Sequence, residues 1–112
     1  MERGAIVLVR FPFSDYSSQK LRPALVISSN NLKDVCVSFI SSMLPSELEA
    51  TDYVLRESTK DFLPTGLKKT SVFKMNKIAT LERNIILGPL GKVSSELQKT
   101  LDQKLKKALG LD

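Results

Sequence analysis

Arg22 is the residue of this chain whose type and position best suit chemistry. It stands between a polar segment, which begins after Phe11-Pro12-Phe13, and the apolar run Ala24-Leu25-Val26-Ile27. A guanidinium presents fixed hydrogen-bond donors that match phosphate oxygens two at a time, so an arginine where a loop enters a strand is suited to hold a phosphate. The alternative is a surface salt bridge, for instance with Asp15, which would carry no function.

Two serines form a second candidate group. Ser41 and Ser42 follow the apolar stretch Val35-Cys36-Val37-Ser38-Phe39-Ile40. A hydroxyl at the end of a strand is able to hydrogen-bond a scissile phosphate. A strand-end serine more commonly caps the backbone, and the sequence leaves both interpretations open.

A third candidate is the segment Lys74-Met75-Asn76-Lys77. Side chains alternate along a strand, which would place Lys74 and Asn76 on one face. There the lysine would contact a backbone phosphate and the amide a base edge. A solvated edge strand whose lysines oppose aggregation explains the segment equally well.

The polar segment before Arg22 holds a fourth group. It contains Asp15, Gln19 and Lys20 together with Tyr16, whose ring is able to stack on a base. These residues would guide a single-stranded nucleic acid toward Arg22. Loop polarity alone accounts for the same residues without any function.

The composition narrows the chemistry that is open to these residues. The chain has no histidine, a single cysteine, Cys36, and no glycine-rich phosphate loop. These absences argue against the common zinc sites, His acid–base catalysis and an intramolecular disulfide. Any hydrolysis is therefore expected to need no metal or other cofactor. RNA permits such a reaction, because its own 2′-OH attacks the neighbouring phosphate and the protein only has to position the strand, move protons and stabilise charge.

The totals predict one basic domain that spans residues 1–112. A net charge of +5 and a pI near 9.5 fit a polyanionic partner, such as nucleic acid or an acidic protein segment. Solubility alone is the alternative explanation of this charge. No apolar run approaches the length of a membrane span, and the N-terminus does not read as a signal peptide, so we expect a cytoplasmic protein without a membrane partner.

Several short strands should position the candidate residues. Residues 4–11 and 24–29 read as a hairpin with a long connection, with Pro23 opening its second strand. Further elements are expected as strands at 35–40, 52–55, 70–75, 77–81 and 85–87, a short helical turn at 45–50 and an irregular stretch at 60–69.

The C-terminal part predicts an amphipathic helix. Ser94 or Ser95 would cap its start, and Gly110 would end it. Its apolar stripe recurs every fourth residue, at Leu97, Leu101, Leu105 and Leu109. Short strands with one closing helix predict a mainly β fold, a small and strongly curved barrel-like sheet with the helix packed on it.

The first strands also carry a family resemblance. The opening resembles the MazF/PemK toxins of bacterial toxin–antitoxin pairs, in its PemK-like form, through Gly4-Ala5-Ile6-Val7-Leu8-Val9, Phe11-Pro12-Phe13-Ser14-Asp15 and Arg22-Pro23-Ala24-Leu25-Val26-Ile27-Ser28. The similarity continues in residues 37–41, 71–81 and the C-terminal helix. It implies an SH3-like small barrel of the CcdB/MazF/PemK type with a C-terminal helix, working as a homodimer.

The resemblance further implies an activity. Toxins of this kind are sequence-specific, metal-independent endoribonucleases that cut single-stranded mRNA and leave a 2′,3′-cyclic phosphate and a 5′-hydroxyl. An acidic antitoxin protein neutralises them by covering the RNA groove. Arg22 falls on the family's arginine that acts on the scissile phosphate, and Ser41 falls where many members have a threonine.

The sequence departs from the family pattern at other positions. Lys74 and Asn76 stand where PemK-type toxins have an arginine and an aspartate, and Asn76 cannot act as a base. The stretch Ser17-Ser18-Gln19 lacks the glycine and glutamate of many members. Asp15 then remains as a candidate base, while Gln19, Lys20, Lys74 and Asn76 would contact the RNA.

Two rival functions stay open at this point. One is a non-catalytic module that binds an acidic antitoxin or nucleic acid through the same groove. The other is a toxin that poisons DNA gyrase by protein contact, as related barrels do. The pair Arg22-Pro23 favours the ribonuclease, because a gyrase-directed toxin would not need an arginine that faces a phosphate.

Overall fold

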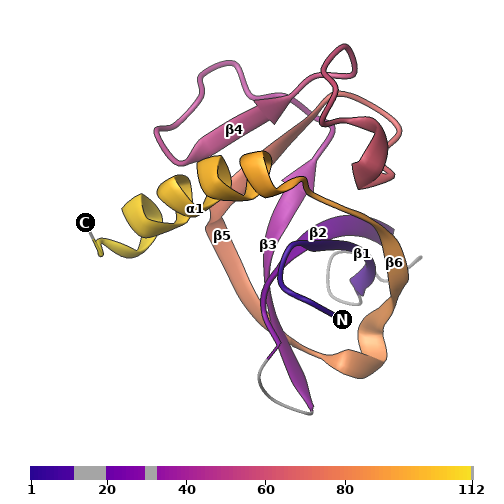
Figure 1. The fold of residues 1–112 in the computed structure, drawn as a ribbon. Coiled ribbons are helices and arrows are strands. Elements are labelled where there is room, and N and C mark those ends of the chain that lie inside the picture. The colour runs from indigo at the N-terminus through magenta and orange to yellow at the C-terminus, as the bar shows by residue number, and fades with distance from the viewer. Residues whose placement is uncertain (12–19, 30–32, 112) are drawn as a thin grey trace.

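Six antiparallel strands form one sheet in the order β4-β5-β3-β2-β1-β6 (Figure 1). The computed structural model describes residues 1–11, 20–29 and 33–111. The elements are β1 (Ala5–Phe11), β2 (Lys20–Ser28), β3 (Asp34–Ser41), β4 (Asp52–Leu55), the 3₁₀ turn η1 (Leu63–Thr65), β5 (Ser71–Glu82), the 3₁₀ turn η2 (Arg83–Ile85), β6 (Ile86–Lys92) and α1 (Ser95–Leu109). The mainly β fold with one C-terminal helix is confirmed, and the sheet is strongly curved but stays open between its edge strands β4 and β6.

The predicted hairpin of the first two strands is confirmed, but its second strand starts earlier than expected. β2 begins at Lys20, which lies opposite Phe11, so Pro23 falls inside the strand and does not open it. Pro23 lies opposite Leu8 on β1, one residue beyond Ala24, where the pairing with β3 ends. Its missing N–H therefore falls outside the β2–β3 ladder, which explains why the strand tolerates it.

The fifth and sixth predicted strands are one strand, β5. Its pairing with β3 jumps between Ser38, which lies opposite Ile78, and Phe39, which lies opposite Lys74. Three residues of β5 are thus left out of the ladder, and this bulge explains why the sequence pattern broke there. The seventh predicted strand is the start of β6, which continues through Pro89 because an edge strand tolerates a residue without an N–H.

The helical turn predicted for residues 45–50 is wrong. The backbone between β3 and β4 forms bends and a turn at its end, where Asp52 N–H donates to the Glu49 carbonyl over 3.0 Å. The Asp52 carboxylate in turn accepts from the Glu49 N–H over 2.9 Å. A local carboxylate–backbone bond of this kind offers the chain an alternative to a helix. The stretch predicted as irregular contains the short η1 turn.

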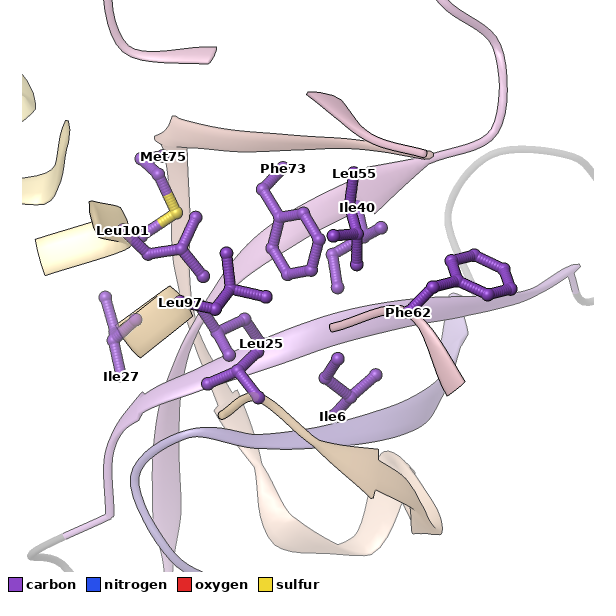
Figure 2. Close-up of a cluster of buried hydrophobic side chains, with 11 residues drawn as sticks. Ile6, Leu25, Ile27, Ile40, Leu55, Phe62, Phe73, Met75, Leu97 and Leu101 are labelled. Atoms are coloured by element: carbon purple, nitrogen blue, oxygen red, sulfur yellow. The ribbon is translucent and has the colours of Figure 1, made fainter. Parts of the chain in front are cut away.

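The helix α1 is confirmed with its caps. Ser94 Oγ accepts from the Leu97 N–H over 3.1 Å, and Gly110 ends the helix with a left-handed backbone, φ 68°. Leu97 and Leu101 reach a buried cluster on the face of the sheet that α1 covers (Figure 2). Within the part of the chain that the structure describes, no helix is long and apolar enough to cross a membrane.

The sheet is buried on both faces of its central strands. Alternate side chains of β1, β2 and β3 point to opposite faces, and each face has its own apolar cluster. The first cluster lies under α1 and η1, and contains Ile6, Leu25, Ile27, Ile40, Leu55, Phe62, Phe73, Met75, Val93, Leu97 and Leu101 (Figure 2). The second fills the inside of the curled sheet, and contains Val7, Val9, Ala24, Val26, Val35, Val37 and Leu81. This double burial makes the strands rigid supports for the side chains at their ends.

An ion pair ties the N-terminus to the helix. Arg3 donates to both carboxylate oxygens of Asp102, over 2.6 and 3.2 Å, and Gln98 donates to the same carboxylate over 3.0 Å. Partial burial raises the pKa of Asp102, but the hydrogen bonds from Arg3 and Gln98 and the charges of Arg3 and Lys106 outweigh it, so the pKa lies below its ordinary value.

Candidate active site

The ends of four strands lie together at one end of the sheet. β1 ends and β2 begins there, and β3 ends where β5 begins, because neighbouring strands run antiparallel. Ser41 at the end of β3 lies opposite Val72, the second residue of β5. A cavity of about 460 Å³ opens at this end of the sheet. Its volume is within the range of about 300–1,000 Å³ that is typical of ligand pockets.

The cavity is lined by apolar side chains and by basic and hydroxyl-bearing side chains. Its apolar lining comes from four strands of the sheet and from the stretch between η1 and β5, and includes Leu8, Leu21, Pro23, Ile40, Leu67 and Leu90. Its polar lining consists of Arg22, Ser41, Ser42, Lys68, Lys69 and Ser71. Three cations and no carboxylate line the cavity among the described residues, so the site favours an anion.

Arg22 and Ser41 meet at this cavity although they lie far apart in the sequence. Ala24 of β2 and Phe39 of β3 form the last pair between these strands, and Arg22 and Ser41 lie two residues beyond it, where both line the cavity. Arg22 is exposed, and no carboxylate of the described residues forms an ion pair with it. Its guanidinium is therefore available to a ligand. Asp15, the salt-bridge partner that the sequence suggested, lies outside the described residues.

Ser41 also serves the backbone. Its Oγ accepts from the Met43 N–H over 3.1 Å, which fixes the turn that follows β3. The hydroxyl's own contact with the Met43 carbonyl is long, 3.5 Å, and such a bond is weak. The hydroxyl proton can therefore turn toward a phosphate oxygen in the cavity while the oxygen keeps its backbone partner. The capping role and the functional role are compatible in this geometry.

Lys74 and Asn76 do not line the cavity. Lys74 is half-buried, opposite Phe39 on β3 and Asp52 on β4. Asn76 lies in the bulge of β5, where its Nδ2 donates to the Glu49 carboxylate over 2.8 Å. Their surroundings thus include two carboxylates. A contact of either residue with RNA stays a prediction.

The remaining predicted site residues lie in or near the first connection. Lys20 is exposed at the start of β2, at the same end of the sheet as the cavity, but it does not line the cavity. Asp15 and Gln19 lie outside the described residues. Their predicted roles as base and RNA contact stay predictions.

Sequence reasoning missed Lys68 and Lys69. They follow η1 in the stretch Leu63-Pro64-Thr65-Gly66-Leu67, which looked merely irregular. Two adjacent lysines after a proline and a glycine were the available signal. Only the fold shows that this stretch lines the same cavity as Arg22 and Ser41.

The family model of the PemK-like, MazF-like toxins of type II toxin–antitoxin systems matches residues 2–109. The chain belongs to this family. The match covers every element of the described fold, from the start of β1 to the last residue of α1. No curated protein sequence matches the chain at a significant level.

Solved MazF structures share the fold of this PemK/MazF-like toxin. An endoribonuclease in complex with its cognate antitoxin, from a mycobacterial species, is 20% identical with a TM-score of 0.75, over 98% of this chain and 95% of that one. The Mycobacterium tuberculosis toxin MazF-mt6 is 20% identical with a TM-score of 0.74, over 96% and 98% of the two chains. A MazE–MazF structure from Deinococcus radiodurans is 18% identical with a TM-score of 0.76, over 100% and 97%.

Proposed function

We propose that this PemK/MazF-family toxin is an endoribonuclease that cuts single-stranded mRNA at specific sequences without a metal ion. The observation that carries the proposal is the meeting of Arg22 and Ser41 at one basic cavity, with no described carboxylate to neutralise the guanidinium. Two of the proteins with similar structures are named endoribonucleases, which supports the same reaction class.

The proposed reaction uses the nucleophile that RNA itself provides. The 2′-oxygen attacks the adjacent phosphorus, its bond to phosphorus forms, and the bond from phosphorus to the 5′-oxygen breaks. The products are a 2′,3′-cyclic phosphate and a 5′-hydroxyl. The 2′-hydroxyl proton passes to a base, for which Asp15 is the candidate, and the leaving 5′-oxygen takes a proton from water.

Arg22 and Ser41 have separate roles in this proposal. Arg22 holds the non-bridging phosphate oxygens and stabilises the charge that grows on them in the transition state. Ser41 donates a hydrogen bond to the same phosphate. Gln19, Lys20, Lys74 and Asn76 guide the strand outside the cavity and influence affinity more than the chemical step.

The proposed partners are single-stranded RNA, a second copy of the chain and an acidic antitoxin. The net charge of +5 suits RNA and an acidic protein segment alike. Two of the similar structures are complexes of a toxin with its antitoxin. Sedimentation of the purified toxin would test the homodimer, and co-purification with a small acidic protein encoded beside it would test the antitoxin. The proposed place of action is the cytoplasm.

The deciding experiment is cleavage of a long single-stranded RNA by the purified protein in excess EDTA, beside Arg22→Ala and Lys107→Ala. We expect cuts at a few recurring short motifs with 5′-hydroxyl ends, retained in Lys107→Ala, which changes an exposed cation of α1, and lost in Arg22→Ala. Intact RNA with the wild-type protein across several substrates would contradict the proposal. A non-catalytic binding module or a gyrase-directed toxin would then be the better interpretation.

A further inference from the structure

Lys68 and Lys69 face the same cavity as Arg22 but have no part in the proposed reaction. Both side chains are exposed and line the cavity from the stretch between η1 and β5, whereas Arg22 lines it from β2. The cavity therefore carries positive charge on two separate walls. A single phosphate held by Arg22 accounts for only one of them.

The backbone before the two lysines is held tightly against β6. Gly66 has a left-handed backbone, φ 74°, and a Cβ at this position would lie 2.1 Å from the Leu90 carbonyl oxygen. A Cβ on Gly91 of β6 would likewise lie 2.2 Å from the Pro64 carbonyl oxygen. Only glycines allow such a close approach of two backbones. The stretch is thereby fixed to the edge of the sheet at one end.

Side-chain hydrogen bonds hold the same stretch on both sides of the lysines. The buried Thr65 hydroxyl accepts from the Leu67 N–H over 3.2 Å. After the lysines, Ser71 Oγ donates to the Lys69 carbonyl over 2.8 Å, and the Glu57 N–H donates to Thr70 Oγ1 over 3.0 Å.

The structure thus fixes the backbone of the lysines and leaves their ammonium groups exposed. A charged group on a pre-positioned backbone binds a ligand with a smaller loss of conformational entropy than one on a free loop. Lysine is a compact charge on a flexible stem, so it suits phosphates whose exact position varies from one substrate to another. The geometry fits recognition of a polyanion backbone, without reading bases.

We propose that Lys68 and Lys69 bind the RNA backbone phosphates next to the phosphate that Arg22 holds. The RNA strand then crosses the cavity from Arg22 on β2 and Ser41 on β3 to the two lysines in the stretch before β5. This inference rests on the proposed function and names where its substrate runs. The two lysines supply affinity that is independent of base sequence and depends on salt.

The test compares two double variants that remove the same charge. Lys68→Ala/Lys69→Ala removes the two cavity lysines, and Lys106→Ala/Lys107→Ala removes two exposed lysines at the far end of α1, close to the C-terminus in Figure 1. Fluorescence anisotropy with labelled, mixed-sequence single-stranded RNA carrying 2′-O-methyl groups measures binding without cleavage, across salt concentrations. Cleavage of unmodified RNA gives KM and kcat, and circular dichroism checks folding.

The cavity variant should bind RNA about tenfold more weakly at about 0.1 M salt. Its slope of log affinity against log salt should be smaller by roughly 1.4, since each phosphate of a single strand that a lysine neutralises contributes roughly 0.7 to the slope. We expect KM to rise and kcat to stay within about twofold.

The inference is wrong if the cavity variant and the α1 variant have the same slope and affinity. Wild-type protein that binds RNA without cutting it would contradict the proposed reaction, while the slopes would still decide the role of the lysines. Wild-type protein that does not bind RNA would overturn both proposals before any variant is compared.

Discussion

Two regions that share strand β5 differ in electrostatic character. At the start of the strand, the cavity brings Arg22, Lys68 and Lys69 together with no carboxylate among its described lining residues. Further along, Lys74 lies opposite the buried Asp52, and Asn76 is hydrogen-bonded to Glu49. The cavity lining thus carries an excess of positive charge, whereas the surroundings of Lys74 and Asn76 include the carboxylates of Asp52 and Glu49. This difference favours the cavity over the surroundings of Lys74 and Asn76 as the place for an anionic ligand.

The largest effect should come from removing the guanidinium at the cavity. Arg22→Ala should lower the cleavage rate by about 10²–10³-fold, which is typical of losing one group that stabilises transition-state charge. Arg22→Lys should recover only a small part of the rate, because an ammonium cannot bind two phosphate oxygens in the same fixed geometry. Single-turnover cleavage kinetics measure both. A loss of less than about threefold in Arg22→Ala would break the comparison.

A smaller effect is expected for the hydroxyl at the end of β3. Ser41→Ala should lower kcat about tenfold, since a hydrogen bond to a charged group contributes about 1.5–3 kcal/mol. The control is Ser41→Thr, which keeps the hydroxyl and should retain activity within about threefold. Thermal unfolding of both variants separates this loss from the loss of the bond to the Met43 N–H. Equal activity of the two variants would show that the hydroxyl only caps the backbone.

The region around Asn76 should respond in stability more than in catalysis. Asn76→Asp places a second acceptor-only carboxylate against Glu49, where the amide now donates over 2.8 Å. Because the pair is exposed, we expect a loss of stability below about 1 kcal/mol. Asn76→Ala should change KM by at most about threefold and leave kcat unchanged. A tenfold fall in kcat for Asn76→Ala would instead show that Asn76 contributes to the chemical step.

The smallest effect concerns a charge pair far from both regions. Asp102→Asn should lower stability by about 0.5 kcal/mol or less at neutral pH, because solvent reaches both Arg3 and Asp102. The pKa of Asp102 is lowered in the folded state, so its contribution is present above the unfolded pKa and is lost as pH falls through the folded pKa.

Thermal unfolding of wild type and Asp102→Asn from pH 7 down to about pH 3 tests this dependence, and the difference between the two curves should begin to shrink below about pH 4. Adding Arg3→Met to both proteins completes a double-mutant cycle that isolates the pair. A constant difference across the whole pH range would show that Asp102 acts through packing instead of charge.

The sequence predicted which helices and strands form better than it predicted the residues at which they begin and end. Alternation and capping were enough for the first hairpin, for β3 and β4 and for α1 with Ser94 and Gly110, because these signals are local. The bulge in β5 and the continuation of β6 through Pro89 depend on pairing with distant strands. The turn at Glu49–Asp52 replaced the predicted helical turn through one side-chain bond.

The site was predictable only where local signals marked its residues. Arg22 and Ser41 were chosen as strand-end residues, and in the structure both line the same cavity. Lys68 was not chosen, because its position depends on the approach of Gly66 to Leu90, which no local pattern encodes. Whether the chosen residues act in catalysis is decided by the measurements above.

The open edge at β6 has a consequence for the behaviour of the protein at high concentration. An edge strand is a template on which another chain can build a sheet. Pro89 has no N–H to offer, and two register shifts interrupt the pairing of β6 with β1. An incoming strand would therefore meet a broken ladder. We therefore expect β6 to be a poor template for growth of a sheet from chain to chain.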